Sequence, residues 1–336
     1  METKNNKNIE FLEKEEKVEK ENIDIDNKNN ENIENKKNKI NKTNIKKFLK
    51  NLGIIVGKDI LRFILRIIEI VILIFGICYF INWSNDSINV TYDTYKNESI
   101  PNSFDNYKIL QISDFNNKDD IANTLINKVK NVNPDIIVIT GDYVNSDRCD
   151  KYNIDYTLLE ELVKIYPIYF VTGEQEQDFR DYDEFKNKIE ELGIEVLDNE
   201  SIDIEKNNDK ITLIGINDSA FFFENTTTLN KTIKKLNKEN NFTILLAHRP
   251  ELINIYTENK IPLVLAGHAL GGQFNFPFIG PFYSSNQGFY PDFTSGFYKQ
   301  EDTSLYVSRG VGNTFIPIRL FNNPEINVIT LKKGSK

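Results

Sequence analysis

Two histidines and several acidic side chains are the residues of this 336-residue sequence best suited to chemistry. His248 and His268 are its only histidines, and each closely follows a short apolar run. Acidic and amide side chains follow other apolar runs in the same way, in Asp114-Phe115-Asn116, Gly141-Asp142 and Gly173-Glu174-Gln175-Glu176. Mixed oxygen and imidazole donors suit Mn, Fe or Zn. These residue types therefore favour the hypothesis of a metal-assisted hydrolase.

The elements that must position these side chains are short strands alternating with helices. Apolar runs that predict buried strands are Ile109–Ile112, Asp135–Thr140, Ile168–Thr172, Ile211–Ile216, Phe242–Ala247 and Pro262–Ala266. Amphipathic stretches that predict helices are Asp120–Val132, Tyr156–Tyr166 and Tyr182–Leu192. Two later stretches, Thr294–Arg309 and Glu325–Lys332, predict strands without intervening helices. An α/β start and a strand-rich finish predict a layered sandwich with sheet inside and helices outside.

The polar clusters are expected to meet in space, because the carboxyl ends of strands in an open α/β sheet converge on one crevice. Each cluster taken alone could instead cap the following helix, and for Asp114 alone that interpretation would be preferred. Five clusters at five strand ends favour a common site. Gly141, Gly173 and Gly267 allow sharp turns and close backbone approach beside it.

Composition limits the other functions. The sequence holds 41 Lys and Arg against 50 Asp and Glu, a net charge of −9, so a general nucleic-acid binder is excluded. Cys78 and Cys149 lie far apart, which predicts neither a disulfide framework nor a thiolate metal cage.

The N-terminal part has a different composition from the rest. Residues 1–44 are rich in Asn, Lys and Glu and are predicted to be disordered. Residues 45–66 predict a basic amphipathic helix at a membrane surface. Residues 67–83 are long and apolar enough to predict a transmembrane helix, with a buried core helix as the alternative. We expect a linker over residues 84–106 and a folded domain over residues 107–336.

Charge flanking the apolar segment predicts its orientation. Its N-terminal side carries Lys36, Lys37, Lys39, Lys42, Lys46, Lys47, Lys50, Lys58, Arg62 and Arg66. No Lys or Arg occurs between Trp83 and Lys96. The positive-inside bias predicts a cytoplasmic N-terminus and an extracytoplasmic domain in the cell membrane. Glu69 can pair with Arg66 on one helix face.

The C-terminal half contains further motifs. Leu263–His268 leads into Gly271-Gly272-Gln273 and Pro277–Gly280, and later motifs are Thr294–Tyr298, Leu305–Asn313 and Pro317–Phe321. From about Lys108 to its end the sequence resembles the calcineurin-like metallophosphoesterases, and within them the small membrane-anchored bacterial branch. This resemblance implies a four-layer α-β-β-α sandwich and a phosphoric ester hydrolase.

Several positions depart from the family's motifs. Asp-x-His has become Asp114-Phe115-Asn116, and the catalytic histidine of the third motif is Gln175, followed by Glu176. The Asn of that motif is Glu174, and the final Gly-His-x-His keeps His268 but has Leu270. Gly141-Asp142 and His248 are retained.

The resemblance implies two metal sites with unequal losses. The first would use Asp142, Glu174, His248 and His268 and could still bind one Mn, Fe or Zn ion. The second would use Asp114, Asp142 and the residues at positions 116 and 270. Asn116 is a weak ligand, and Leu270 has no ligand atom. We expect the second metal to be weak or absent.

The expected function follows from those losses. Without a histidine at positions 116, 175 and 270, the chain is expected to hydrolyse phosphodiester or lipid pyrophosphate bonds weakly with one metal, if at all. A phospholipid or lipid-linked pyrophosphate at the bilayer is the expected substrate class. The alternative is a catalytically dead pseudoenzyme that acts as a membrane-tethered binding or scaffold domain. A third possibility is a rearranged, oxygen-rich site of Asn116, Glu174 and Gln175 that prefers Mg or Mn.

Overall fold

The computed structural model describes residues 36–37, 39–47, 50, 58–147, 149–150, 152–218, 226–238, 241–284, 287–313 and 318–334. The chain divides into two compact units, Met1–Ile77 and Cys78–Lys336. Most of the predicted disordered tail lies outside the described residues, whereas residues 39–47, which overlap its end, are helical.

One long helix contains the apolar segment. Helix α2 spans Lys58–Asp86, so the predicted transmembrane segment and the end of the predicted juxtamembrane helix form one continuous element. An 18-residue window within its stretch Arg62–Asp86 has a mean hydropathy of 2.6, and none of that window is buried in the protein. This helix is long and apolar enough to cross a bilayer. The predicted pairing of Arg66 with Glu69 is confirmed, with 3.3 Å between Nη1 and Oε2.

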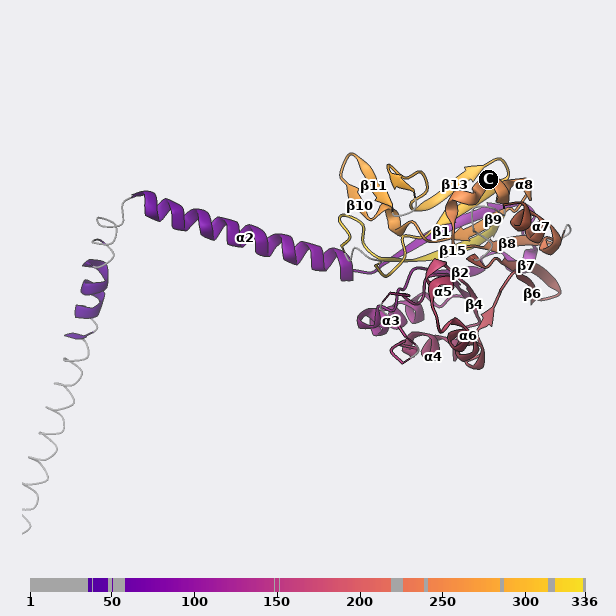
Figure 1. Ribbon diagram of the computed structural model, residues 1–336, viewed down its shortest axis with the longest axis horizontal. Coiled ribbons are helices and arrows are strands. Elements are labelled where there is room, and N and C mark those ends of the chain that lie inside the picture. The colour runs from indigo at the N-terminus through magenta and orange to yellow at the C-terminus, as the bar shows by residue number, and fades with distance from the viewer. Residues whose placement is uncertain are drawn as a thin grey trace, which may run out of the picture. The chain divides into compact units, whose positions relative to one another are not determined.

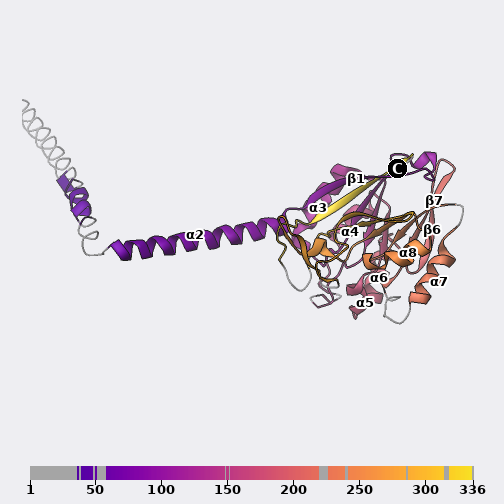
Figure 2. The same ribbon diagram turned by 90° about the horizontal axis from the view of Figure 1, so that it is seen from above.

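The second unit contains two six-stranded sheets and a small third sheet (Figures 1 and 2). The first sheet has the order β1 (Asn89–Asn97), β15 (Glu325–Lys333), β2 (Lys108–Ile112), β3 (Ile136–Thr140), β4 (Ile168–Val171), β5 (Glu195–Val196). The second has the order β13 (Gly296–Gln300), β14 (Thr303–Val307), β9 (Leu263–Ala266), β8 (Phe242–Leu246), β7 (Asp209–Gly215), β6 (Glu200–Lys206). The small sheet has the order β10 (Phe274–Phe276), β11 (Gly280–Ser284), β12 (Gly288–Phe289).

Helices cover the outer faces of both large sheets. On the first sheet these are α3 (Ala122–Val132), α4 (Thr157–Val163) and α6 (Tyr182–Glu191). On the second they are α7 (Thr226–Leu236) and α8 (Ile253–Glu258). Short helical turns occupy several connections: η1 (Asn102–Phe104), η2 (Asp119–Ile121), α5 (Glu174–Asp178), η4 (Pro250–Leu252) and η5 (Leu270–Gly272).

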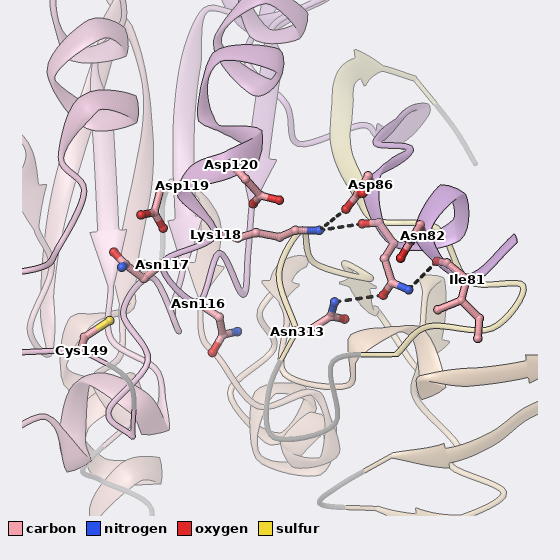
Figure 3. Close-up of a pocket in the computed structure, with 11 residues that line it drawn as sticks. Ile81, Asn82, Asp86, Asn116, Asn117, Lys118, Asp119, Asp120, Cys149 and Asn313 are labelled. Carbon is pink, nitrogen blue, oxygen red and sulfur yellow. Dashed lines mark hydrogen bonds and ion pairs between the residues drawn. The ribbon is translucent and has the colours of Figure 1, made fainter. Parts of the chain in front are cut away.

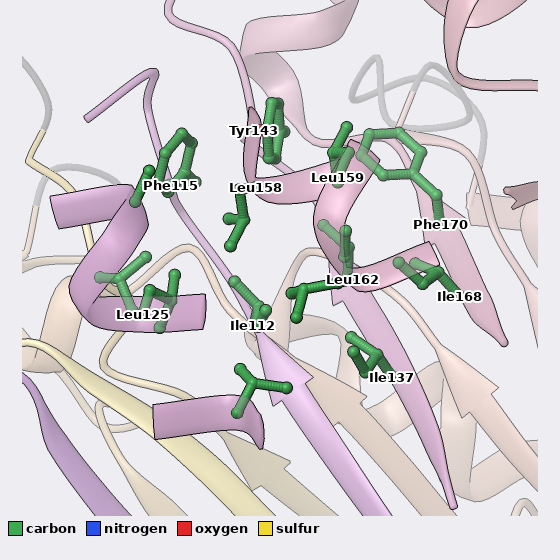
Figure 4. Packing of buried hydrophobic residues seen from close by; sticks show 14 of the residues in the cluster. Ile112, Phe115, Leu125, Ile137, Tyr143, Leu158, Leu159, Leu162, Ile168 and Phe170 are labelled. Atoms are coloured by element: carbon green, nitrogen blue, oxygen red, sulfur yellow. The ribbon is translucent and has the colours of Figure 1, made fainter. Parts of the chain in front are cut away.

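The alternation of side chains along each strand produces the four layers. Ile137 and Ile139 of β3 pack against the α3 and α4 side chains, as in Figure 4, where Ile137 lies near Leu162 and Ile168. Ile136 and Val138 of the same strand face the second sheet and join the core between the sheets. Since a strand points successive side chains to opposite faces, one apolar run serves two cores. The predicted α-β-β-α sandwich is confirmed.

The structured domain begins earlier than residue 107. Strand β1, within the predicted linker over residues 84–106, pairs in parallel with β15 along its full length, from Asn89 opposite Glu325 to Asn97 opposite Lys333. That part of the linker prediction is therefore wrong. Its partner lies more than 200 residues further along the sequence, so local pattern could not predict the pairing.

Candidate metal centre

The five predicted clusters occupy the ends of five strands. Asp114 follows β2, Asp142 follows β3, Glu174 follows β4, His248 follows β8 and His268 follows β9. In each sheet the strands preceding these clusters run parallel to one another, so their carboxyl ends share an edge.

Strained backbone turns project three of these side chains. Asp114, Asp142 and His268 have φ of 53°, 54° and 70°, in the left-handed region that non-glycine residues seldom adopt. Such conformations persist where surrounding contacts hold them, and they concentrate at functional sites. Gly141 permits a close approach, because a Cβ there would lie 2.6 Å from Nδ1 of His248. The glycine therefore lets the β3 turn pack directly on the imidazole.

Asp142, His248 and His268 form a compact cluster. Nε2 of His248 lies 3.3 Å from Oδ2 of Asp142 and 3.1 Å from Nδ1 of His268. One ligand atom from each residue lies within 4.8 Å of the others, and all three side chains are buried. One carboxylate and two imidazoles that converge in this way fit Zn, Mn or Fe.

A backbone carbonyl orients His248. Its Nδ1 lies 2.7 Å from the oxygen of Thr140, the last residue of β3. A carbonyl only accepts, so Nδ1 carries the proton, which leaves Nε2 to face Asp142 and His268. Metal-binding histidines usually have such a partner on the second ring nitrogen. Nε2 is therefore the ring nitrogen that would bind a metal ion, after losing any proton it carries.

The charges at the cluster oppose one another. Burial disfavours protonation of His248, but the Asp142 and Asp114 carboxylates outweigh it and raise its pKa well above the ordinary value. Burial and the neighbouring His248 charge lower the pKa of His268 well below its ordinary value. Burial and the Asp142 carboxylate raise the pKa of Asp114 to about 6, against the opposing effect of His248. A divalent cation would relieve this concentration of buried carboxylates.

Asp114 is beside the cluster but outside the set of three. Its two carboxylate oxygens accept the backbone N–H of His268 at 3.2 and 3.1 Å. This bond holds the His268 turn in place.

Asn116 and Leu270 occupy the predicted weak second site. Asn116 Oδ1 accepts Nδ2 of Asn145 at 3.3 Å, whereas its own buried Nδ2 has no partner among the described residues. Asn116 also lines a cavity of about 490 Å³ together with Lys118 and Asn313 (Figure 3). Leu270 is buried.

Glu174 is paired with a cation. Its Oε2 lies 3.2 Å from Nη2 of Arg249, which also binds Asp218 in a bidentate arrangement, with Nε to Oδ1 at 2.8 Å and Nη2 to Oδ2 at 2.9 Å. Nη1 of Arg249 is 3.7 Å from Glu251. Three carboxylates therefore surround this arginine beside the site. Burial and Asp142 raise the pKa of Glu174.

Asp218 was missed by the sequence analysis. It follows the apolar run Ile211–Ile216 by two residues, as the other clusters follow theirs. The same strand-end rule could have identified it.

Gln175 and Glu176 support the loops. Gln175 Oε1 accepts the backbone N–H and the hydroxyl of Ser146, each at 3.0 Å. The Glu176 carboxylate is buried and accepts backbone N–H groups at 2.7 to 3.0 Å from Asp142, Tyr143, Val144 and Gly173. It therefore joins the β3 and β4 turns, an orientation that the sequence left open.

The four-layer fold and the Asp–His cluster at its strand ends define a metallophosphoesterase-type domain. Residues 107–271 match the calcineurin-like phosphoesterase family. The chain is 30% identical over 252 residues to the uncharacterized metallophosphoesterase YkuE of Bacillus subtilis, covering 73% of this chain and 86% of that protein. This chain belongs to the calcineurin-like phosphoesterase family, whose members use divalent metals.

Other relatives point to membrane association. The chain is 29% identical over 197 residues to the uncharacterized metallophosphoesterase YkoQ of Bacillus subtilis, covering 57% of this chain and 70% of that protein. It is 27% identical over 251 residues to a zebrafish (Danio rerio) protein described as a transmembrane protein with metallophosphoesterase domain, covering 70% of this chain and 56% of that protein. This description and the apolar helix α2 together indicate membrane association.

Proposed function

We propose that this protein is a membrane-anchored metallophosphoesterase that binds one divalent ion and hydrolyses phosphodiester or lipid pyrophosphate bonds weakly. The observation that supports this proposal is the convergence of Asp142, His248 and His268, whose ligand atoms lie within 4.8 Å of one another. Glu174 is the proposed further ligand, and it would have to leave or share its contact with Arg249.

A divalent ion bound by these residues would supply Lewis acidity toward a phosphoryl oxygen. The protein's own groups orient the donors. The Thr140 carbonyl orients the His248 ring, and Asp114 holds the His268 turn by accepting the backbone N–H of His268. These contacts preorganise the donor set, which lowers the cost of ordering it on binding.

Slow turnover follows from the absence of a positioned acid. Gln175 stands at the family's acid position, and an amide cannot donate a proton to a departing alkoxide as an imidazolium can. Glu176 cannot replace it in this arrangement, because its carboxylate is enclosed by four backbone donors. Loss of a general acid reduces rates by roughly 10² to 10⁴.

The enzyme proposal is tested with the full-length protein purified in detergent. We expect hydrolysis of an aryl phosphodiester with Mn²⁺, and His268→Ala should abolish it. Lys188→Ala, at an exposed position on α6, is the matched control and should retain the rate. Equal rates for His268→Ala and the parent protein would refute the proposed site.

The second candidate is a pseudoenzyme that keeps the fold as a membrane-tethered binding or scaffold domain. The observation that favours it is that Gln175 Oε1 accepts hydrogen bonds from the backbone N–H and hydroxyl of Ser146, a contact within the loops. The combined change Asn116→His, Gln175→His and Leu270→His discriminates between the candidates. The pseudoenzyme is favoured if the parent protein has no detectable activity and the triple variant hydrolyses at about 100 times the detection limit or more. An already competent enzyme should gain little.

Metal content separates the one-metal proposal from the rearranged, oxygen-rich site. Elemental analysis of the purified protein should find about one metal per chain, which we propose to be Mn, Fe or Zn. A content of about two with a preference for Mg or Mn would favour participation of Asn116 and Glu174 in a second site.

The proposed location is the cell membrane, with the N-terminus in the cytoplasm and the phosphoesterase domain outside. The excess of Lys and Arg before α2 supports this orientation. We propose a phospholipid or a lipid-linked pyrophosphate as the substrate class. Lys188→Cys in intact cells should react with a membrane-impermeant maleimide. Labelling only after permeabilisation would reverse the orientation.

A further inference from the structure

Residues 274–290 form an uncharged aromatic segment, which we call the aromatic flap. These 17 residues contain no Asp, Glu, Lys or Arg, although charged residues make up 27% of the whole sequence. Seven are aromatic: Phe274, Phe276, Phe278, Phe282, Tyr283, Phe289 and Tyr290. This composition differs from that of an ordinary solvated loop.

The described part of the flap exposes several of its apolar side chains. The small sheet of β10, β11 and β12 supports them, and it is separate from both large sheets. Phe278 is fully exposed at 109%, while Ile279, Phe289 and Tyr290 are 63 to 67% exposed. Exposed apolar side chains gathered on one small sheet favour an interaction site.

Aromatic contacts hold the flap in shape. The Phe282 ring lies 5.8 Å from that of Phe276, 5.3 Å from that of Phe289 and 5.5 Å from that of Tyr290, all edge to face. Such pairs stabilise a defined arrangement. The exposed rings therefore belong to an ordered surface.

The base of the flap meets the last turns of α2. Phe274 bridges to Leu320, and the backbone N–H of Asn275 donates to the Leu320 oxygen at 2.9 Å. The neighbouring Phe321 ring lies 5.0 Å from Phe80, a residue of α2 within the folded unit. Phe80 also contacts Trp83 at 6.1 Å.

Polar contacts fix the same helix end to the domain. Asn85 Oδ1 accepts the backbone N–H of Arg319 at 3.0 Å, and Lys118 Nζ donates to the backbone oxygen of Asn85 at 2.8 Å. Lys118 also pairs with Asp86 at 3.1 Å. The flap base and the end of the apolar helix thus contact the same part of the domain.

We infer that the aromatic flap docks into the lipid surface of the membrane that α2 crosses. The apolar stretch Arg62–Asp86 ends beside the flap base, and Trp83 stands where aromatic residues concentrate at a membrane–water interface. An uncharged, aromatic surface next to that position suits the boundary between headgroups and acyl chains. A bilayer is therefore the occupant that chain continuity and charge both favour.

Docking would bring the metal centre to the lipid surface. Phe274 follows His268 by only six positions, through the turn η5. A docked flap would keep the His268 turn close to lipid headgroups. This inference rests on the proposed membrane anchoring, and it requires no turnover.

The sole tryptophan of the sequence provides the test. In the full-length protein, Trp83→Phe combined with Phe278→Trp places a single tryptophan on the flap. Reconstituted in nanodiscs at one copy each, this variant should lose at least about half its emission when the lipid acyl chains are brominated. Trp83→Phe combined with Lys231→Trp is the matched control. Lys231 is exposed on α7, at the far end of the domain from β10 and β11 (Figure 1), and the emission of this control should not change.

Each other outcome overturns the inference. Equal emission of the Phe278→Trp variant in brominated and ordinary lipid, with ready quenching by acrylamide, would show a flap exposed to water. Shielding from acrylamide without quenching by brominated lipid would identify protein as the occupant. Circular dichroism matching that of the parent protein establishes that each variant is folded. Metal content and hydrolysis are measured separately, so failure of docking is distinguishable from failure of the proposed activity.

Discussion

Nδ1 of His268 lies 3.1 Å from Nε2 of His248, although the two residues are 20 positions apart. The strands that precede them, β8 and β9, are parallel neighbours, and the Gly267 N–H donates to the His248 oxygen at 3.1 Å. The parallel strands of the second sheet therefore place the two imidazoles next to each other. Asp142, which follows β3 of the first sheet, completes the cluster. The candidate centre thus joins the two halves of the sandwich.

Removing either histidine should eliminate bound metal. His248→Ala and His268→Ala each take away one of three clustered donors, so metal content should fall from about one per chain to near zero. Elemental analysis after dialysis against Mn²⁺ provides the measurement. Lys188→Ala, at an exposed position on α6, is the control and should retain about one metal. Full occupancy in either histidine variant would contradict the assignment.

Glu176→Gln should destabilise the domain. The carboxylate accepts four backbone N–H groups from the β3 and β4 turns, and an amide of the same shape presents its own donors to some of them. Buried donors left without an acceptor should cost about 2 to 4 kcal/mol. Thermal unfolding of the full-length protein in detergent with chelator measures this without a metal contribution. Glu191→Gln, exposed on α6, should change stability by less than about 0.5 kcal/mol. Equal shifts in the two variants would show that Glu176 does not join the turns.

The strand-end cluster was predictable because its cause is local. An apolar run such as Phe242–Ala247 predicts a buried strand, and a polar residue directly after it must lie at the sheet edge. This reasoning predicted that His248, His268 and Asp142 would meet. It did not predict the partner of Glu174, because Arg249 is shared with Asp218 from the end of β7.

Side-chain direction in the β4 turn was not predictable. Gln175 and Glu176 lie in the five-residue helix α5, and their directions depend on the loop after β3, about 30 residues away. The pairing of β1 with β15 joins residues more than 200 positions apart. In both cases the arrangement depends on contacts with residues distant in the sequence, which the local pattern does not predict.

Asp203→Asn should weaken the fold at neutral pH and not in acid. Burial favours the neutral acid, but hydrogen bonds from Lys238, Thr212 and Lys210 outweigh it and lower the pKa of Asp203. A lowered pKa stabilises the folded state above the ordinary value of 3.8, and that contribution is lost as pH falls through the folded pKa.

The size of this effect is small because solvent screens the charges. We expect a loss of at most about 1 kcal/mol at pH 7 in Asp203→Asn, which shrinks as pH falls below 3.8 and vanishes below the folded pKa. Unfolding with denaturant across this range provides the measurement. Asp183→Asn, exposed on α6, is the control and should change stability by less than about 0.5 kcal/mol. A deficit in Asp203→Asn that persists undiminished at the most acidic pH at which the parent protein stays folded would contradict the charge-based explanation.

Gly310→Ala should disturb the centre through the turn that carries Asp114. Gly310 has φ of 68°, and a Cβ there would lie 2.7 Å from the Asp114 Cβ, which real contacts do not reach. Gly296 is a matched control, since its φ is 80° and nothing lies within 4 Å of its added Cβ. A positive φ strains alanine at both positions, but only at position 310 would the added Cβ also overlap another atom. Gly310→Ala should therefore be less stable than Gly296→Ala by about 1 to 3 kcal/mol, measured by thermal unfolding.

Because Asp114 holds the His268 N–H, Gly310→Ala should also bind Mn²⁺ more weakly, whereas Gly296→Ala should not. Equal stability and equal affinity in the two variants would show that the Asp114 turn tolerates displacement and does not set the geometry of the cluster.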